Sequence, residues 1–179
     1  MKGTVVLALL ALALCTGSAL ASGTSVGVMP YGGYATPVLQ ADTGGGAIFG
    51  VRAPVGLSVL TLEPFYASSS LGDKTETLGG LSYTRSGFNL SAFGVSAILG
   101  ANGTFYPFAG IGSWKLSRSG SDDITNTGWN FGVGIKVPAG EKISFHIRGE
   151  MDMIVNGETS RKFVTATAGL SYNLFTKSE

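Results

Sequence analysis

The strictest pattern in this sequence is a two-residue alternation near its carboxyl end. Between residues 164 and 174, all six positions of one parity are apolar, and all five of the other are polar or glycine. Successive side chains of a β-strand point to opposite faces, so this segment predicts a strand with one apolar and one polar face. Residues 129–137 repeat the pattern, and residues 143–155 repeat it with Gly149 and Ile154 out of phase.

Weaker alternation upstream predicts five more strands, which makes eight in all. They are expected at residues 25–35, 44–53, 57–69, 81–99 and 105–117. Within residues 81–99 the apolar positions change from even to odd numbers, which a β-bulge would explain. A second bulge is expected at Pro64, because proline has no N–H to donate to a neighbouring strand.

The connections between these strands alternate in length. Short ones with turn-forming residues follow the second, fourth and sixth strands, at residues 53–56, 100–104 and 138–142. Longer polar ones follow the other strands, at residues 36–43, 70–80, 117–128 and 156–161. Such alternation is typical of a membrane barrel, whose hairpins open in turn on the two sides. The short turns are expected in the periplasm and the long loops outside the cell.

The first residues have the layout of an export signal. A basic residue precedes an apolar stretch at residues 5–14, and the small residues of a cleavage site follow at Ala19 and Ala21. We therefore expect a signal peptide over residues 1–21, cleaved after Ala21, and a single domain over residues 22–179. No apolar run of about 18 residues follows the cleavage site, so only a closed β-barrel could span a membrane.

The direction of the apolar face separates two kinds of protein. In a soluble sheet the apolar face forms the core, whereas in a membrane barrel it meets lipid and the polar face lines the lumen. Charged residues make up only 13% of the chain, against roughly 25% in typical soluble domains. The polar face is rich in glycine, serine and threonine, which fit the narrow interior of an eight-stranded barrel. The sequence therefore predicts an all-β protein, an eight-stranded antiparallel up-and-down transmembrane β-barrel.

A family resemblance points the same way. The export signal, the eight alternating strands and the ending at residues 168–175 together resemble the small OmpA/OmpX-like outer-membrane β-barrels. Residues 108–112 also resemble the glycine-rich fifth strand of that family. The resemblance covers nearly all of the mature chain. It implies the outer membrane of a Gram-negative bacterium, contact with its lipid and lipopolysaccharide, and biogenesis by the barrel-assembly machinery and periplasmic chaperones.

Charged residues on the polar face are expected to fill the lumen. Isolated buried ions cost several kcal/mol each, so they are predicted to pair in a salt-bridge network. The predicted members are Arg52, Glu63, Lys136, His146, Arg148, Glu150 and Asp152, and Lys115 shares their face. The role of such a network is structural, and a barrel filled in this way is expected to conduct few ions or none.

Aromatic residues of the lipid-facing side are expected to form two belts at the level of the lipid headgroups. The predicted periplasmic belt consists of Tyr106, Phe108, Tyr172 and Phe175. The predicted extracellular belt consists of Tyr66, Trp114 and Trp129.

The expected function is that of a non-enzymatic outer-membrane barrel, structural or acting at the surface through short extracellular loops. One alternative is a lipid A-modifying enzyme, because Ser144, His146 and Glu150 share a strand face and a lipid A deacylase uses these three residue types. Another is an exported soluble carrier of the lipocalin kind. We expect a monomer without cofactor or metal. The sequence has no block of like charges of the kind that would suggest binding to nucleic acid.

Overall fold

The computed structural model describes residues 24–38, 43–57, 60–100, 103–156 and 159–176. The predicted signal peptide, with Ala19 and Ala21, lies outside these ranges. Within them, no helix has both the length and the apolar character to cross a membrane.

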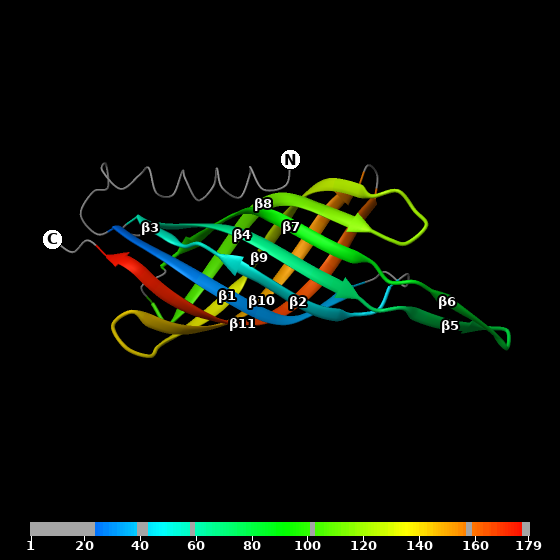
Figure 1. Ribbon diagram of the computed structural model, residues 1–179, viewed down its shortest axis with the longest axis horizontal. Helices are drawn as coiled ribbons and strands as arrows, with labels where there is room; N and C mark the ends of the chain where they lie inside the picture. The colour runs from blue at the N-terminus through cyan, green and yellow to red at the C-terminus, as the bar shows by residue number, and fades with distance from the viewer. Residues whose placement is uncertain (1–23, 39–42, 58–59, 101–102, 157–158, 177–179) are drawn as a thin grey trace.

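The described chain is all β-structure. Its strands are β1 (Thr24–Val38), β2 (Gly46–Arg52), β3 (Val55–Leu57), β4 (Leu60–Leu71), β5 (Lys74–Leu78), β6 (Leu81–Arg85), β7 (Asn89–Leu99), β8 (Phe105–Ser117), β9 (Ile124–Pro138), β10 (Ile143–Asn156) and β11 (Thr159–Thr176). Antiparallel pairing of neighbours along the chain, and of β1 with β11, closes the sheet into an eight-stranded barrel (Figure 1). The strands β5 and β6 form a separate hairpin that extends beyond one end of the barrel. We call this the hairpin end, and the opposite end, where β1 begins and β11 finishes, the terminal end.

The strands β2 and β3 together form one strand of the barrel. Their register against β1 and β4 does not shift across the gap between them. The gap lies at Pro54, which has no N–H, while Ala53 still donates its N–H to the Pro64 carbonyl at 2.9 Å. The turn expected at residues 53–56 was therefore wrong. The bulge expected at Pro64 was also wrong, because β4 keeps its register with β7 through this residue.

The segment predicted as a single strand over residues 81–99 is divided. Its first part belongs to the β5–β6 hairpin, and the barrel strand begins only at Asn89. The register of β7 is regular, with Leu90 buried in the barrel and Phe93 exposed outside. The apparent change of phase is therefore not a bulge. It arises because apolar residues occupy the inner face at Phe88 and Leu90 and the outer face from Phe93 onwards.

Three strands at the hairpin end are longer than predicted. The strand β9 starts inside the loop expected at residues 117–128, while β10 and β11 extend through most of the loop expected at 156–161. These strands have 15, 14 and 18 residues, whereas crossing a membrane takes about 9–11. The barrel wall therefore extends beyond the thickness of a bilayer.

The two faces of the barrel wall differ as a membrane barrel requires. Large apolar side chains are exposed on the outside, including Phe49, Val95, Phe131, Val133, Ile135, Val137, Phe145, Ile147, Val164, Leu170 and Leu174. Charged side chains are buried inside, including Arg52, Glu63, Arg148 and Glu150. A soluble sheet would bury the first group and expose the second.

The lumen also contains an apolar cluster that the sequence reasoning did not predict. It occupies the hairpin end and consists of Tyr31, Ala35, Ile48, Phe65, Ala67, Leu71, Phe88, Leu90, Ala92, Trp114, Leu116, Ile154 and Phe163. The guanidinium groups of Arg118 and Arg161 lie 3.7 and 4.8 Å from the ring centre of Phe88, within cation–π range. The out-of-phase Ile154 was a signal of this cluster in the sequence.

Three aromatic residues assigned to the belts lie in the lumen instead. Tyr106, Phe108 and Trp114 are buried on the inner face of β8, so their assignment to the lipid-facing belts was wrong. The physical reason is the glycines of the neighbouring strand β9. Tyr106 is paired with Gly134 and Phe108 with Gly132, and the missing side chains leave the space that the rings occupy. Tyr66, Trp129, Tyr172 and Phe175 are exposed outside, and their place in belts stays a prediction.

Substituting Gly134 with alanine is expected to cost about 1–3 kcal/mol of folding free energy. An added Cβ would clash with the ring of Tyr106, whose hydroxyl is held by hydrogen bonds. Gly149→Ala is the matched control, because a Cβ there meets nothing within 4 Å. Urea unfolding of the barrel in detergent micelles measures both variants. Equal effects of the two substitutions would contradict this packing.

Candidate functional site in the barrel lumen

Four buried charged side chains form a continuous chain of ion pairs across the lumen. Arg148 on β10 donates two hydrogen bonds to Glu63 on β4, at 2.5 and 2.7 Å. Arg52 at the end of β2 donates to Glu150 at 2.8 Å, and its Nε lies 3.6 Å from Glu63. Each acid therefore faces at least one guanidinium, and Glu63 lies between two. The paired two-bond geometry between Arg148 and Glu63 is the strongest that these groups make.

The alternation of inward and outward side chains along each strand directs these groups into the lumen. Arg148 and Glu150 are successive inward positions of β10, so their side chains lie about 7 Å apart along the wall. Arg52 and Glu63 face inward from β2 and β4, on another part of the wall. The long side chains of arginine and glutamate bridge the space between these two parts of the wall.

A series of hydrogen bonds continues from this chain toward the terminal end. Arg148 Nε donates to the Tyr106 hydroxyl at 2.8 Å, and that hydroxyl is 2.8 Å from His146 Nδ1. His146 Nε2 is 3.0 Å from the Ser171 hydroxyl, which donates to the Ser144 carbonyl at 3.3 Å. Because Ser171 uses its proton on the carbonyl, we assign the proton of a neutral His146 to Nε2. Tyr106 then donates to Nδ1, so Tyr106, His146 and Ser171 each donate one hydrogen bond in the series.

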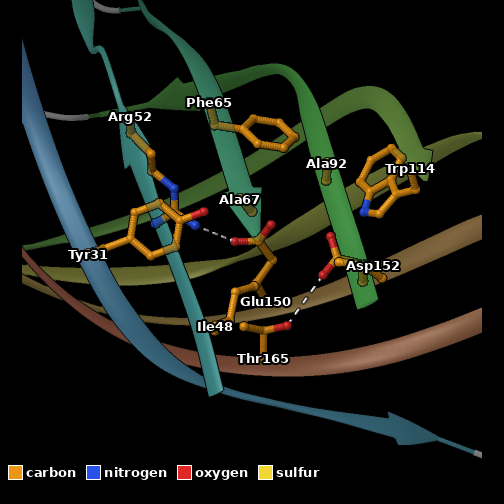
Figure 2. Close-up of a pocket in the computed structure, with 11 residues that line it drawn as sticks. Tyr31, Ile48, Arg52, Phe65, Ala67, Ala92, Trp114, Glu150, Asp152 and Thr165 are labelled. Atoms are coloured by element: carbon orange, nitrogen blue, oxygen red, sulfur yellow. Dashed lines mark hydrogen bonds and ion pairs between the residues drawn. The ribbon is translucent and has the colours of Figure 1, made fainter. Parts of the chain in front are cut away.

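Polar residues on the other side of Glu150 complete its surroundings. Asn130 donates to Glu150 Oε1 and to the Ser96 hydroxyl, both at 2.9 Å. Thr165 donates to Asp152 at 3.3 Å. Figure 2 shows these two acids at the boundary between the ion pairs and the apolar cluster, with the Tyr31 ring beside Arg52. The guanidinium of Arg52 lies 4.0 Å from the centre of that ring.

A small cavity of about 10 Å³ lies at this boundary (Figure 2). Arg52, Glu150, Asp152 and Thr165 line it on one side, and Phe65 and Trp114 on another. This volume is that of about one water molecule, and the site has the polar partners that a buried water needs. It is far below the roughly 300–1,000 Å³ of a pocket for a small-molecule ligand.

The remaining predicted charges lie at the margins. Lys136 is half-buried on the inner face of β9, where it is paired with His146 across the sheet. Lys115, which the sequence placed on the luminal face, is on the outer face of β8 and forms an ion pair with Asp123. It faces outward because the inner positions of β8 here are Trp114 and Leu116.

Sequence reasoning missed several polar members of the site. Tyr31, Ser96, Tyr106, Asn130 and Ser171 all contact the charged residues or extend their hydrogen bonding. Parity was a usable signal for Asn130 and Ser171, which share the inner face with the predicted charges. No signal existed for Tyr106, because an aromatic side chain on an alternating strand suits lipid and lumen equally well.

The residues of the enzymatic alternative are not assembled as a catalytic set. His146 is bonded to Tyr106 and Ser171, while Glu150 is bonded to Arg52 and Asn130. Ser144 contributes its backbone carbonyl to the series. Within the described ranges, no group of three histidine, cysteine or acidic residues is placed to hold a metal ion.

Comparison with solved structures identifies the fold. Neisserial surface protein A matches with 15% identity over 84% of this chain and 97% of that one, at a TM-score of 0.56. The N-terminal β-barrel domain of Pseudomonas aeruginosa OprF matches with 17% identity over 86% of this chain and 100% of its own, at 0.49. The Ail protein of Yersinia pestis matches with 16% identity over 86% of this chain and 100% of its own, at a TM-score of 0.44. No protein-family model matches the chain, and no curated protein matches it significantly.

The predicted fold class is confirmed. The chain is an all-β protein with the closed eight-stranded antiparallel transmembrane barrel of the small outer-membrane proteins that it resembles.

Proposed function

We propose that this protein is a non-enzymatic outer-membrane barrel whose lumen is closed by its own side chains and which acts at the cell surface. The observation that supports this proposal is a distribution of side chains opposite to that of a soluble protein. Large apolar groups are exposed outside, and paired charges are buried inside. Exposed apolar groups over the whole wall would aggregate in water but are stable against lipid.

The contents of the lumen support a structural role for its charges. The ion pairs occupy the middle, the apolar cluster occupies the hairpin end, and Ile98, Tyr106 and Phe108 pack together toward the terminal end. Such a filling leaves the segments at the hairpin end as the parts able to meet a partner. They would face outward after export through the predicted signal peptide and insertion by the barrel-assembly machinery. The barrel would act as a monomer in contact with lipopolysaccharide.

Cell fractionation tests the proposal directly. The protein is expected in the outer-membrane fraction, to resist extraction by salt and alkali, and to be released by detergent. The same purified material is expected to show no steady open current in a planar bilayer. A water-soluble monomer would instead favour the carrier alternative, and a steady current would show a water path through the ion pairs.

A further inference from the structure

The hairpin beyond the barrel has two chemically different faces. Cross-strand partners in a β-hairpin share a face, and successive pairs alternate between faces. One face consists of hydroxyl residues, with Thr75 bonded to Thr84 at 2.9 Å and Thr77 to Ser82 at 3.2 Å. The other face carries the pairs Leu78 with Leu81, Glu76 with Tyr83, and Lys74 with Arg85. The hairpin is thus amphipathic.

The tip of the hairpin is apolar and exposed. Leu78 is 77% exposed, Leu81 is 63% exposed and Tyr83 is 56% exposed. Gly79 and Gly80 join the strands with φ angles of 59° and 84°, the backbone of a tight two-residue turn. Because the turn is so short, the two leucines flank the tip of the hairpin, and the hairpin extends beyond the barrel at this end (Figure 1).

The basic residues of the hairpin lie at its base, on the same face as the leucines. Lys74 and Arg85 are cross-strand partners, and they are four residues back from Leu78 and Leu81. At about 3.3 Å per residue, the charges lie roughly 13 Å behind the tip. No charged residue lies between Glu76 and Arg85, and residues 74–85 carry two basic groups and one acid.

We propose that this tip inserts into the surface of an apposed phospholipid bilayer. Apolar groups of interfacial segments enter about 5–10 Å into the boundary between headgroups and acyl chains. With Leu78 and Leu81 at that depth, Tyr83 reaches the headgroup level, where aromatic residues concentrate. Lys74 and Arg85 then lie among the phosphates, whose charge they complement.

Two observations favour an apposed membrane over other occupants. The hairpin continues away from the barrel end, so it does not fold back toward the bilayer around the barrel (Figure 1). Three apolar side chains are also far fewer than the roughly 20–30 residues on each side of a specific protein interface. Insertion into a bilayer needs no such area, because lipid closes around each side chain.

The test uses the full barrel in lipid nanodiscs, to which vesicles of phosphatidylcholine and phosphatidylglycerol in equal parts are added. Leu81→Cys carries an environment-sensitive fluorophore, since the chain's only natural cysteine is Cys15. The emission is expected to shift to the blue on addition of vesicles and to be quenched by brominated acyl chains. The same fluorophore at Ser121→Cys, in the loop between β8 and β9, is expected to show neither change.

Flotation with the same vesicles measures the contribution of each side chain. The double variant Leu78→Ser, Leu81→Ser is expected to bind at least about tenfold more weakly, as the transfer free energy of leucine requires. Ile124→Ser, an exposed apolar position at the start of β9, is the matched control and should bind like the parent protein. Lys74→Gln with Arg85→Gln should weaken binding to these vesicles but not to pure phosphatidylcholine.

Three results would each overturn the proposal. The first would be that the parent protein in nanodiscs does not float with the vesicles. The second would be that the leucine variant floats as well as the parent. The third would be that the emission of the fluorophore at position 81 is already blue-shifted before vesicles are added, which would place the tip in the nanodisc bilayer around the barrel. Heat-modified mobility on gels confirms that each variant barrel is folded, so loss of binding is not loss of structure.

Discussion

Glu63→Gln is expected to destabilise the folded barrel by about 3–5 kcal/mol. Glu63 is buried and pairs with both luminal arginines, through two hydrogen bonds from Arg148 and a 3.6 Å contact with Arg52. Glutamine keeps the shape but removes the charge, which leaves the Arg148 guanidinium buried without an acid. Urea unfolding in lipid vesicles, followed by the intrinsic fluorescence of the protein, measures the loss.

Two further variants separate the loss of stability caused by breaking the ion pair from any loss caused by the substitution itself. Glu76→Gln makes the same change on the exposed hairpin, where the acid is 3.9 Å from Lys74, and should cost less than about 1 kcal/mol. Combining Glu63→Gln with Arg148→Met removes both partners, and it should recover much of the stability because no unpaired ion remains. A double variant as unstable as the sum of its single changes would show that the pair is not the source of the effect.

Trp114→Ala is expected to cost about 3–5 kcal/mol of folding free energy. Trp114 is 1% exposed in the apolar cluster of the lumen, next to Phe65, whose ring centre is 6.3 Å away. Alanine would leave a cavity that the rigid barrel wall cannot close. Trp129→Ala is the matched control, because Trp129 is 55% exposed on the outer face and lipid fills the space that its ring leaves.

The same unfolding measurement distinguishes the two positions of tryptophan. A much larger loss at Trp114 than at Trp129 is expected if the hairpin end of the lumen is a packed core. Equal small losses would instead place both residues against lipid, as the sequence reasoning assumed for the belts. Fluorescence quenching by brominated lipid in each single-tryptophan variant gives an independent readout, with strong quenching expected only for Trp129.

The order of the elements and the sidedness of the barrel could be predicted because they are local properties. An alternating segment such as residues 164–174 reports its own strand and its own two faces, without knowledge of any partner. The positions of Arg52, Glu63, Arg148 and Glu150 on the inner face followed from parity in the same way. Scarce charge and a glycine-rich polar face then decided which side meets lipid.

Side-chain partners could not be predicted, because they depend on the register between strands far apart in the sequence. The register of β8 with β9 sets Tyr106 beside Gly134, so an aromatic residue that could have faced lipid turns inward. Closure of the barrel brings Glu63 to Arg148, 85 residues away in the chain. The sequence by itself thus determined an alternating wall with an apolar exterior. Only the tertiary structure decided what fills the lumen, because filling depends on the volumes that neighbouring strands leave to one another.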